Sequence, residues 1–425
     1  MSSGMQQAPP RESTAQGPAS DTISIVQRGN LKALEDALRR QWRLGQNIVL
    51  CWSPTDNGIL ILLVPHYFLG NYSAVENRAA AESNEEFIRH LISGHRRKNR
   101  DEFFDIANRL GVAPTFVRLS VELSEERSVV NAVEQLVKRY GISYVTHRAV
   151  LLFDIAEFSL YTPFEQASQL NSLSYSLNSA YSKLLKKGIE INFARTTTGD
   201  GYYVWNRDGS AQADIDLFHF LILVIADNKL AREASKGNTV PLIRCAFHIG
   251  SHYELYQAEG VNPTLFSYIV GDVTIELARM LDLSFPGQVY VGDFTTTLPD
   301  QAASVDSLAF LDACTDSIER LYGIALSGEK VSRIVCQPAQ VVGADGNLQA
   351  RRFTLTDKHG ITRSSYSLQV ELRTDGGSTL ELGLSDAALP AIPGAGSSVD
   401  TSVAGTIDGQ KIATLLKRAA KLNSL

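Results

Sequence analysis

The chain has 425 residues, of which 44% are hydrophobic and 20% charged, with a formal net charge of −6. This length accommodates two or three domains, one of them with a sizeable core. The charge provides no basic footprint for nucleic acid, and the longest apolar run, residues 217–226, is too short to cross a bilayer.

The first 21 residues are polar with several prolines and predict a disordered tail. They contain no apolar segment of the kind found in signal peptides, so we expect a cytoplasmic protein. The cysteines lack metal-type spacing, which favours reduced, buried thiols at Cys51, Cys245, Cys314 and Cys336.

Residues 22–146 predict a small N-terminal α+β module. A helix is expected over residues 31–43, and Asp56-Asn57-Gly58 lies between two apolar runs as in a β-hairpin. Residues 85–111 read as helix with a break near Ser93-Gly94. A basic cluster, residues 95–100, follows that break, and we interpret it as a solvated helix face rather than a phosphate site.

Residues 147–330 form the next predicted domain. An apolar run ending in Asp154 indicates a strand buried on both faces, and Thr162-Pro-Phe-Glu165 is a capping box that opens a helix. A strand, a Gly199-Asp200-Gly201 turn and a second strand follow. The remaining pattern is typical of an antiparallel sheet with helices on one face: helix 213–234, strand 242–249 with 250–256 returning beside it, helix 272–283 and strand 288–291.

The C-terminal part has a different texture. Short β runs divided by turn signals predict a small all-β module over residues 331–386. Residues 387–425 read as a Pro/Gly/Ser/Ala-rich linker followed by a basic amphipathic helix, which we expect to dock or pack rather than anchor in a membrane.

Two carboxylates and one guanidinium suggest phosphoryl-transfer chemistry. Asp154 at a strand end and Asp200 on a neighbouring hairpin tip could share a pair of divalent ions, and the turn over residues 155–159 could present N–H groups to phosphates. Arg279 on a predicted helix suits developing negative charge. Each feature also has a structural explanation, because Asp-Gly is a common hairpin turn and Arg279 could pair with Glu276.

Four short motifs follow one another between residues 150 and 330. They are Phe153-Asp154-Ile155 with Phe158-Ser159, Thr198-Gly199-Asp200-Gly201, Arg244-Cys-Ala-Phe-His248-Ile-Gly250, and Tyr268-Ile-Val-Gly271 continuing to Arg279. In this order they resemble the motifs of class III nucleotide cyclases, and the resemblance implies a ferredoxin-like catalytic domain.

The resemblance also implies roles for these residues. Asp154 and Asp200 would bind two Mn²⁺ or Mg²⁺ ions, with the Ile155 carbonyl adding a ligand. Arg279 would stabilise the α-phosphate while the ribose 3′ oxygen attacks it. A homodimer with shared sites is implied, and the implied substrate-binding residues are Phe158, Ser159, Thr196, Tyr268 and Lys330.

The departures from the family concern the base. The purine-reading lysine falls on Thr196 and its partner aspartate on Tyr268, which resembles the pyrimidine cyclases of bacterial Pycsar anti-phage systems. We therefore expect UTP, or else CTP, to be cyclised into a messenger that a separate effector reads. Two alternatives stay open: an adenylate cyclase in which Arg195 takes the place of the lysine, and a catalytically silent nucleotide-binding scaffold.

Overall fold

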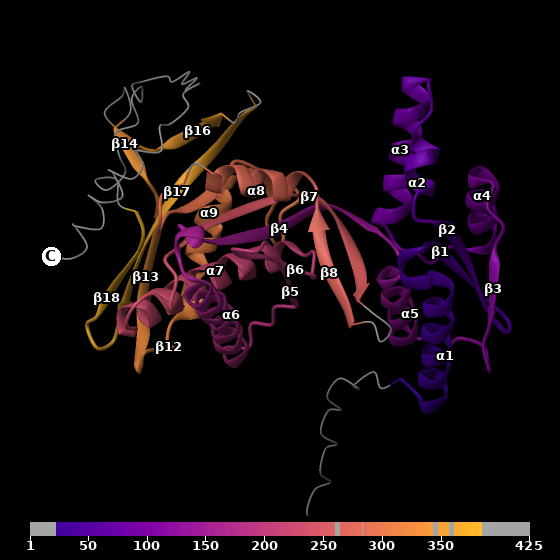
Figure 1. Ribbon diagram of the computed structural model, residues 1–425, viewed down its shortest axis with the longest axis horizontal. Helices are drawn as coiled ribbons and strands as arrows, with labels where there is room; N and C mark the ends of the chain where they lie inside the picture. The colour runs from indigo at the N-terminus through magenta and orange to yellow at the C-terminus, as the bar shows by residue number, and fades with distance from the viewer. Residues whose placement is uncertain (1–22, 260–263, 283, 343–346, 357–360, 385–425) are drawn as a thin grey trace, which may run out of the picture. The chain divides into compact units, whose positions relative to one another are not determined.

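The computed structural model describes residues 23–259, 264–282, 284–342, 347–356 and 361–384 (Figure 1). The chain divides into two compact units, Met1–Ser143 and Tyr144–Leu425, and each is described by itself. The predicted N-terminal tail, the linker and the C-terminal helix lie outside the described residues.

Unit 1 is a three-stranded antiparallel sheet with helices. The sheet order is β1-β2-β3, and the predicted hairpin is confirmed because Thr55 pairs with Gly58. The elements in chain order are α1 (Ile25–Trp42), a short 3₁₀ turn (Arg43–Gly45), β1 (Asn47–Thr55), β2 (Gly58–Pro65), α2 (Phe68–Ser73), α3 (Arg78–Ser93), α4 (Arg100–Leu110), β3 (Thr115–Arg118) and α5 (Arg127–Arg139).

The basic cluster of unit 1 differs from the predicted solvated helix face. It lies between α3 and α4, and Arg96 is fully buried. Its guanidinium donates to the carbonyls of Leu50 (2.9 Å), Ile92 (3.1 Å) and Ile142. Hydrogen bonds to these backbone carbonyls hold the cation inside the unit.

Unit 2 is built on one large sheet. Its elements are β4 (Ser143–Ile155), a 3₁₀ turn (Phe158–Leu160), α6 (Pro163–Lys186), β5 (Phe193–Thr197), β6 (Gly201–Asn206), α7 (Ala211–Ala234), β7 (Ile243–Glu259), β8 (Thr264–Val270), α8 (Asp272–Asp282), β9 (Val289–Gly292), β10 (Thr295–Thr297), β11 (Ser304–Asp306), α9 (Ser307–Asp316), a 3₁₀ turn (Ile318–Leu321), β12 (Ala325–Leu326), β13 (Glu329–Pro338), β14 (Gln340–Val342), β15 (Leu348–Ala350), β16 (Arg352–Thr356), β17 (Thr362–Thr374) and β18 (Thr379–Gly383).

The strands of this sheet follow the order β12-β13-β17-β9-β7-β4-β6-β5. The pairs β12–β13, β13–β17, β17–β9, β4–β6 and β6–β5 are antiparallel, and β7 with β9 is parallel. The mixed α+β class with a mainly antiparallel sheet is thus confirmed. The predicted return of residues 250–256 is wrong, because β7 runs without a break from Ile243 to Glu259 and β8 is the returning strand.

Four of the C-terminal strands, β13, β16, β17 and β18, belong to the large sheet rather than to a module of their own, while β14 and β15 pair only with each other. β17 pairs with β13 and also with β9, where Tyr366 lies opposite Val291. The expectation of a separate module over residues 331–386 came from the turn-rich composition, which does not show which partners the strands find.

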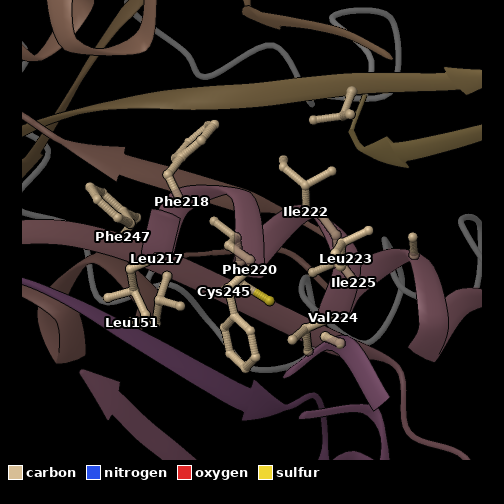
Figure 2. Close-up of a cluster of buried hydrophobic side chains, with 14 of the residues drawn as sticks. Leu151, Leu217, Phe218, Phe220, Ile222, Leu223, Val224, Ile225, Cys245 and Phe247 are labelled. Atoms are coloured by element: carbon tan, nitrogen blue, oxygen red, sulfur yellow. The ribbon is translucent and has the colours of Figure 1, made fainter. Parts of the chain in front are cut away.

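Helices cover both faces of the sheet, not one as predicted (Figure 1). On the α7 face, Leu151 and Phe153 of β4 pack with α6, α7 and α9. Figure 2 shows this cluster, with Leu151 and Phe247 among the side chains of α7. On the other face, here called the α8 face, Val150 and Leu152 pack with Trp205 and with apolar residues of α8.

The sequence also bears on the cysteines and the apolar helices. The four cysteines are free and buried, as predicted. Among the described residues, no helix is both long and apolar enough to cross a membrane.

Candidate functional site

The two aspartates that the sequence predicts as metal ligands lie next to each other in unit 2, where β4 ends and β6 begins. Asp154 is the penultimate residue of β4, and its strand partner in β6 is Gly201. The next backbone N–H, that of Ile155, donates to the carbonyl of Asp200 at 3.0 Å. The hairpin tip is therefore hydrogen-bonded directly to the end of β4.

The glycines of the turn explain this close approach. Gly199 has φ +103°, a conformation that side chains rarely adopt. A Cβ at Gly201 would lie 1.9 Å from the Phe153 carbonyl oxygen, so no larger residue fits there. Thr198 Oγ1 donates to Asp200 Oδ1 at 3.1 Å and orients that carboxylate.

Asp154 is mostly buried, with 9% of its surface exposed. Burial raises the pKa of its carboxyl group, the Arg244 guanidinium lowers it, and the charges of Asp200 and Asp282 raise it further. The charge of Asp200 is thus among the causes that raise the pKa of Asp154, as expected for a nearby like charge. A cation placed between the two carboxylates would relieve their repulsion.

Arg244 of β7 is a site residue to which the sequence analysis gave no role. Its Nε donates to Asp154 Oδ2 at 2.6 Å, and its Nη1 donates to the carbonyl of Ser284 at 3.3 Å. The available signal was position: Arg244 precedes Cys245, which packs on the α7 face, so strand alternation turns Arg244 to the side of Asp154.

The residues present fit a hard divalent cation. Carboxylate and carbonyl oxygens are the ligands that Mg²⁺ and Mn²⁺ prefer, and two aspartates at adjoining strand ends supply them. Within the described part of the chain, no group of three or more His, Cys, Asp or Glu side chains is arranged to hold a metal. Any ion here would depend on the aspartate pair, with backbone, water or ligand oxygens completing its shell.

The turn after β4 is held in an unusual conformation. Glu157 has φ +57°, in the left-handed region, at the position where the resembled family has glycine. Gln166 fixes the turn by donating to the carbonyls of Phe158 (3.0 Å) and Tyr161 (3.1 Å). The predicted capping box is confirmed, since Thr162 and Glu165 bond each other's backbone N–H.

In this turn the N–H groups of residues 155 and 156 are engaged by the carbonyls of Asp200 and Leu242. Within the described residues, no hydrogen bond from the N–H groups of Glu157, Phe158 or Ser159 is found, and Ser159 is exposed. That these three amides bind phosphate stays a prediction.

Arg279 lies in the last turn of α8. Its Nη1 pairs with Asp282 Oδ2 at 3.0 Å. The alternative pairing with Glu276 is not the one seen, because Glu276 pairs with Arg363 of β17 at 2.7 Å. The first turn of α8 is tied to the sheet as well, since Ser251 Oγ donates to Asp272 at 2.9 Å.

Tyr203 connects the aspartate hairpin to α8. It lies on β6, and its hydroxyl donates to the Thr274 carbonyl at 3.0 Å. Burial raises the pKa of Tyr203 to about 12, and the charges of Asp154, Asp200 and Asp282 add to that effect. The hydroxyl therefore remains a donor at neutral pH.

The residues expected to read the base fall on different faces. Thr196 is the strand partner of Tyr203 and shares the α8 face. Arg195 is turned to α6, where Nη1 donates to Asn178 Oδ1 at 3.4 Å and the guanidinium lies 5.6 Å from the Tyr202 ring centroid. Arg195 is thus directed away from the face that carries Asp154.

Tyr268 and Lys330 are not brought to the aspartates. Ser267 accepts a hydrogen bond from Arg207 and Ile269 packs beneath α8, so alternation directs Tyr268 to the opposite face. Lys330 is exposed on β13, separated from β4 in the sheet order by β17, β9 and β7. The described contacts do not assemble these two residues with Asp154 and Asp200.

Comparison with known proteins gives only a distant likeness. No family model matches the chain, and no curated protein matches it. Solved structures similar to it include a rhodopsin-guanylyl cyclase catalytic core of converted specificity (16% identity, TM-score 0.32). They also include the adenylyl cyclase CyaB from P. aeruginosa (14%, 0.34) and the guanylate cyclase domain of RhGC from Catenaria anguillulae (14%, 0.30).

Each of these matches covers 53% of this chain and between 95% and 97% of the other. The low identities and TM-scores leave the function to be inferred from the side chains themselves.

Proposed function

We propose that unit 2 is a class III nucleotide cyclase, which converts a nucleoside triphosphate into the 3′,5′-cyclic monophosphate and pyrophosphate. The observation that carries this proposal is the pairing of β4 with the hairpin, Asp154 opposite Gly201. It places two carboxylates next to each other where β4 ends and β6 begins, beside the turn that follows β4. The sequence motifs around them support the same reaction.

In this reaction the ribose 3′ oxygen bonds to the α-phosphorus and its proton is released. The bond from that phosphorus to the bridging oxygen breaks, and pyrophosphate leaves. Divalent ions would assist by favouring the ionised 3′ oxygen and by neutralising the phosphates. Asp154 and Asp200 would hold those ions, and the amides of residues 157–159 would bind phosphate oxygens.

Arg279 would supply the positive charge that the pentavalent phosphorus needs. We propose that the chain forms a homodimer in which Arg279 serves the site of the partner subunit. Mixing Asp200→Ala with Arg279→Ala protein should then restore activity, to about a quarter of the wild-type value if subunits exchange freely. No recovery, with exchange shown by labelled subunits, would mean that each site is complete in one chain.

For the substrate we propose a pyrimidine nucleotide, UTP ahead of CTP. The orientation of Arg195 toward α6 supports this, because Thr196 then leaves β5 without a cation on the α8 face to read a purine. Because strand alternation turns Tyr268 to the opposite face, we do not propose that its side chain excludes purines. The product would be a messenger for a separate effector in phage defence.

Incubation of the purified chain with each of the four nucleoside triphosphates and Mn²⁺ tests the proposal, with products identified by mass spectrometry. Cyclic UMP or cyclic CMP as the main product is expected, by up to ~10⁴-fold over cyclic AMP. A purine product would overturn the substrate, and no cyclic product would overturn the activity. The messenger role predicts that cyclic nucleotide rises in cells on phage challenge.

A further inference from the structure

The candidate cation site already contains a positive charge of its own. Arg244 Nε lies 2.6 Å from Asp154 Oδ2, and the two side chains are 27% and 13% exposed. Charge-assisted contacts this short between largely buried groups are stronger than surface ion pairs. Arg244 and Asp154 therefore form a strong ion pair rather than an incidental contact.

The arginine is also held in place from behind. Its Nη1 donates to the carbonyl of Ser284, which follows α8. The backbone carbonyl and the carboxylate together fix the guanidinium next to one of the two carboxylate oxygens of Asp154. An ion bound by Asp154 and Asp200 would lie close to this guanidinium and be repelled by it, because both carry positive charge.

We propose that Arg244 is an internal counter-ion for Asp154, which a divalent cation must displace in order to bind. This inference rests on the metal site of the proposed function but assigns Arg244 a separate part in it. Arg244 acts through Asp154 and is a positioning residue: it holds the carboxylate in place while no metal is bound and weakens cation binding to the free protein.

Mn²⁺ titration of the full chain without nucleotide, followed by electron paramagnetic resonance, tests this. Arg244→Met keeps a long apolar stem and removes the charge, so it should bind Mn²⁺ about tenfold more tightly than the wild type or better. Arg244→Lys keeps the charge and should bind almost as weakly as the wild type. Lys183→Met is the matched control, because Lys183 is a half-buried cation paired with Asp227 between α6 and α7.

Thermal unfolding gives a second readout. Arg244→Met should melt below the wild type in chelator, because Asp154 and Asp200 then repel without a counter-ion, and Mn²⁺ should raise its melting temperature more than that of the wild type. If Arg244→Met does not fold, Arg244→Gln, which retains N–H donors, takes its place in both measurements.

Equal or weaker Mn²⁺ binding by the uncharged variant would overturn the inference. Asp154→Asn and Asp200→Asn separate it from the proposed function: if both bind Mn²⁺ as tightly as the wild type, the ion lies elsewhere and both proposals fail. If Arg244→Met binds Mn²⁺ more tightly but the wild-type chain cyclises no nucleotide, the counter-ion role of Arg244 is upheld and the proposed cyclase activity is rejected.

Discussion

Arg96 in unit 1 and Arg244 in unit 2 are both arginines beside an acidic residue, yet their surroundings differ. Arg96 is fully buried, and its guanidinium donates to backbone carbonyls, while Glu134 accepts the backbone N–H of Arg96 at 2.7 Å and the Trp52 indole at 3.2 Å. Arg244 is partly exposed and pairs with the carboxylate of Asp154, near the end of β4.

The difference shows how an arginine that maintains a fold can be told from one near a reaction. No other cation can take the place of Arg96 in the core of unit 1, because loss of Arg96 leaves buried carbonyl groups without a donor. We propose instead that Asp154, at the end of β4, can exchange Arg244 for a metal ion. Removing charge should therefore unfold unit 1 but change the chemistry of unit 2.

The largest effect should come from Asp200. Asp200→Asn removes one of two charges that would hold the metal ions and should lower nucleotide turnover by about three orders of magnitude or more. The fold should persist, because Asp200 lies at a hairpin tip where Thr198 is its hydrogen-bond donor. Turnover by product chromatography and the melting curve check the two halves of this prediction.

Asp208→Asn is the matched control for that experiment. Asp208 follows the other end of the same strand and accepts the backbone N–H of Ser210 at 3.0 Å. Its variant should keep wild-type turnover. Full activity of folded Asp200→Asn would remove this residue from the site.

Arg96→Met should have the second largest effect, on stability rather than chemistry. It leaves the carbonyls of Leu50, Ile92 and Ile142 without their donor and removes a cation from beside Glu134, which keeps its ion pair with Lys138 at 3.4 Å. We expect this to cost about 3–5 kcal/mol of unfolding free energy. Denaturant titration followed by tryptophan fluorescence reports on unit 1 when it is done in a Trp205→Phe background, because the other two tryptophans, Trp42 and Trp52, are both buried there. A loss below about 1 kcal/mol would show that the arginine is dispensable.

The fold of the site was largely predictable because its signals are local. Apolar residues up to Asp154, the glycines of the hairpin and the capping box at Thr162 each fix the backbone near them in the chain. What the sequence missed depends on distant partners. A long strand such as β7 cannot be told from a hairpin at Gly250, because glycine permits a turn without requiring it.

The same limit applies to side chains. The pairing of Arg244 with Asp154 joins residues 90 positions apart, and the burial of Arg96 depends on carbonyls from three separate segments. The outward turn of Tyr268 follows from the register of β7 with β8, which composition does not fix. Pattern can therefore nominate the site residues, while their relative faces require the structure.

Unit 2 also contains a buried acidic residue with a structural role, Asp214. Burial raises the pKa of Asp214 to about 6, although the Ala149 N–H (2.9 Å) and nearby Arg148 oppose the shift and Asp208 adds to it. The folded chain thus holds this proton more tightly than the unfolded chain, so stability falls as pH rises from about 4 to above 6, by about 3 kcal/mol at most.

Asp214→Asn should remove that pH dependence, because the amide resembles the protonated acid and its oxygen can still accept from Ala149. Melting temperatures of variant and wild type should agree near pH 4 and diverge by pH 7, with the variant more stable. A constant difference across this range would mean that Asp214 does not titrate in it.

The smallest effect should come from Tyr203→Phe, which deletes one hydroxyl between the hairpin strand and α8. Loss of the 3.0 Å bond to Thr274 should cost about 1 kcal/mol, because one buried carbonyl loses its donor while the ring keeps its packing. Hydrogen exchange should increase in the first turn of α8, the helix that carries Arg279. Tyr202→Phe is the matched control, since Tyr202 faces Arg195 on the other side of the sheet. If both variants protect α8 as well as the wild type does, packing alone holds this helix against the sheet, and Tyr203 does not link Asp200 to Arg279.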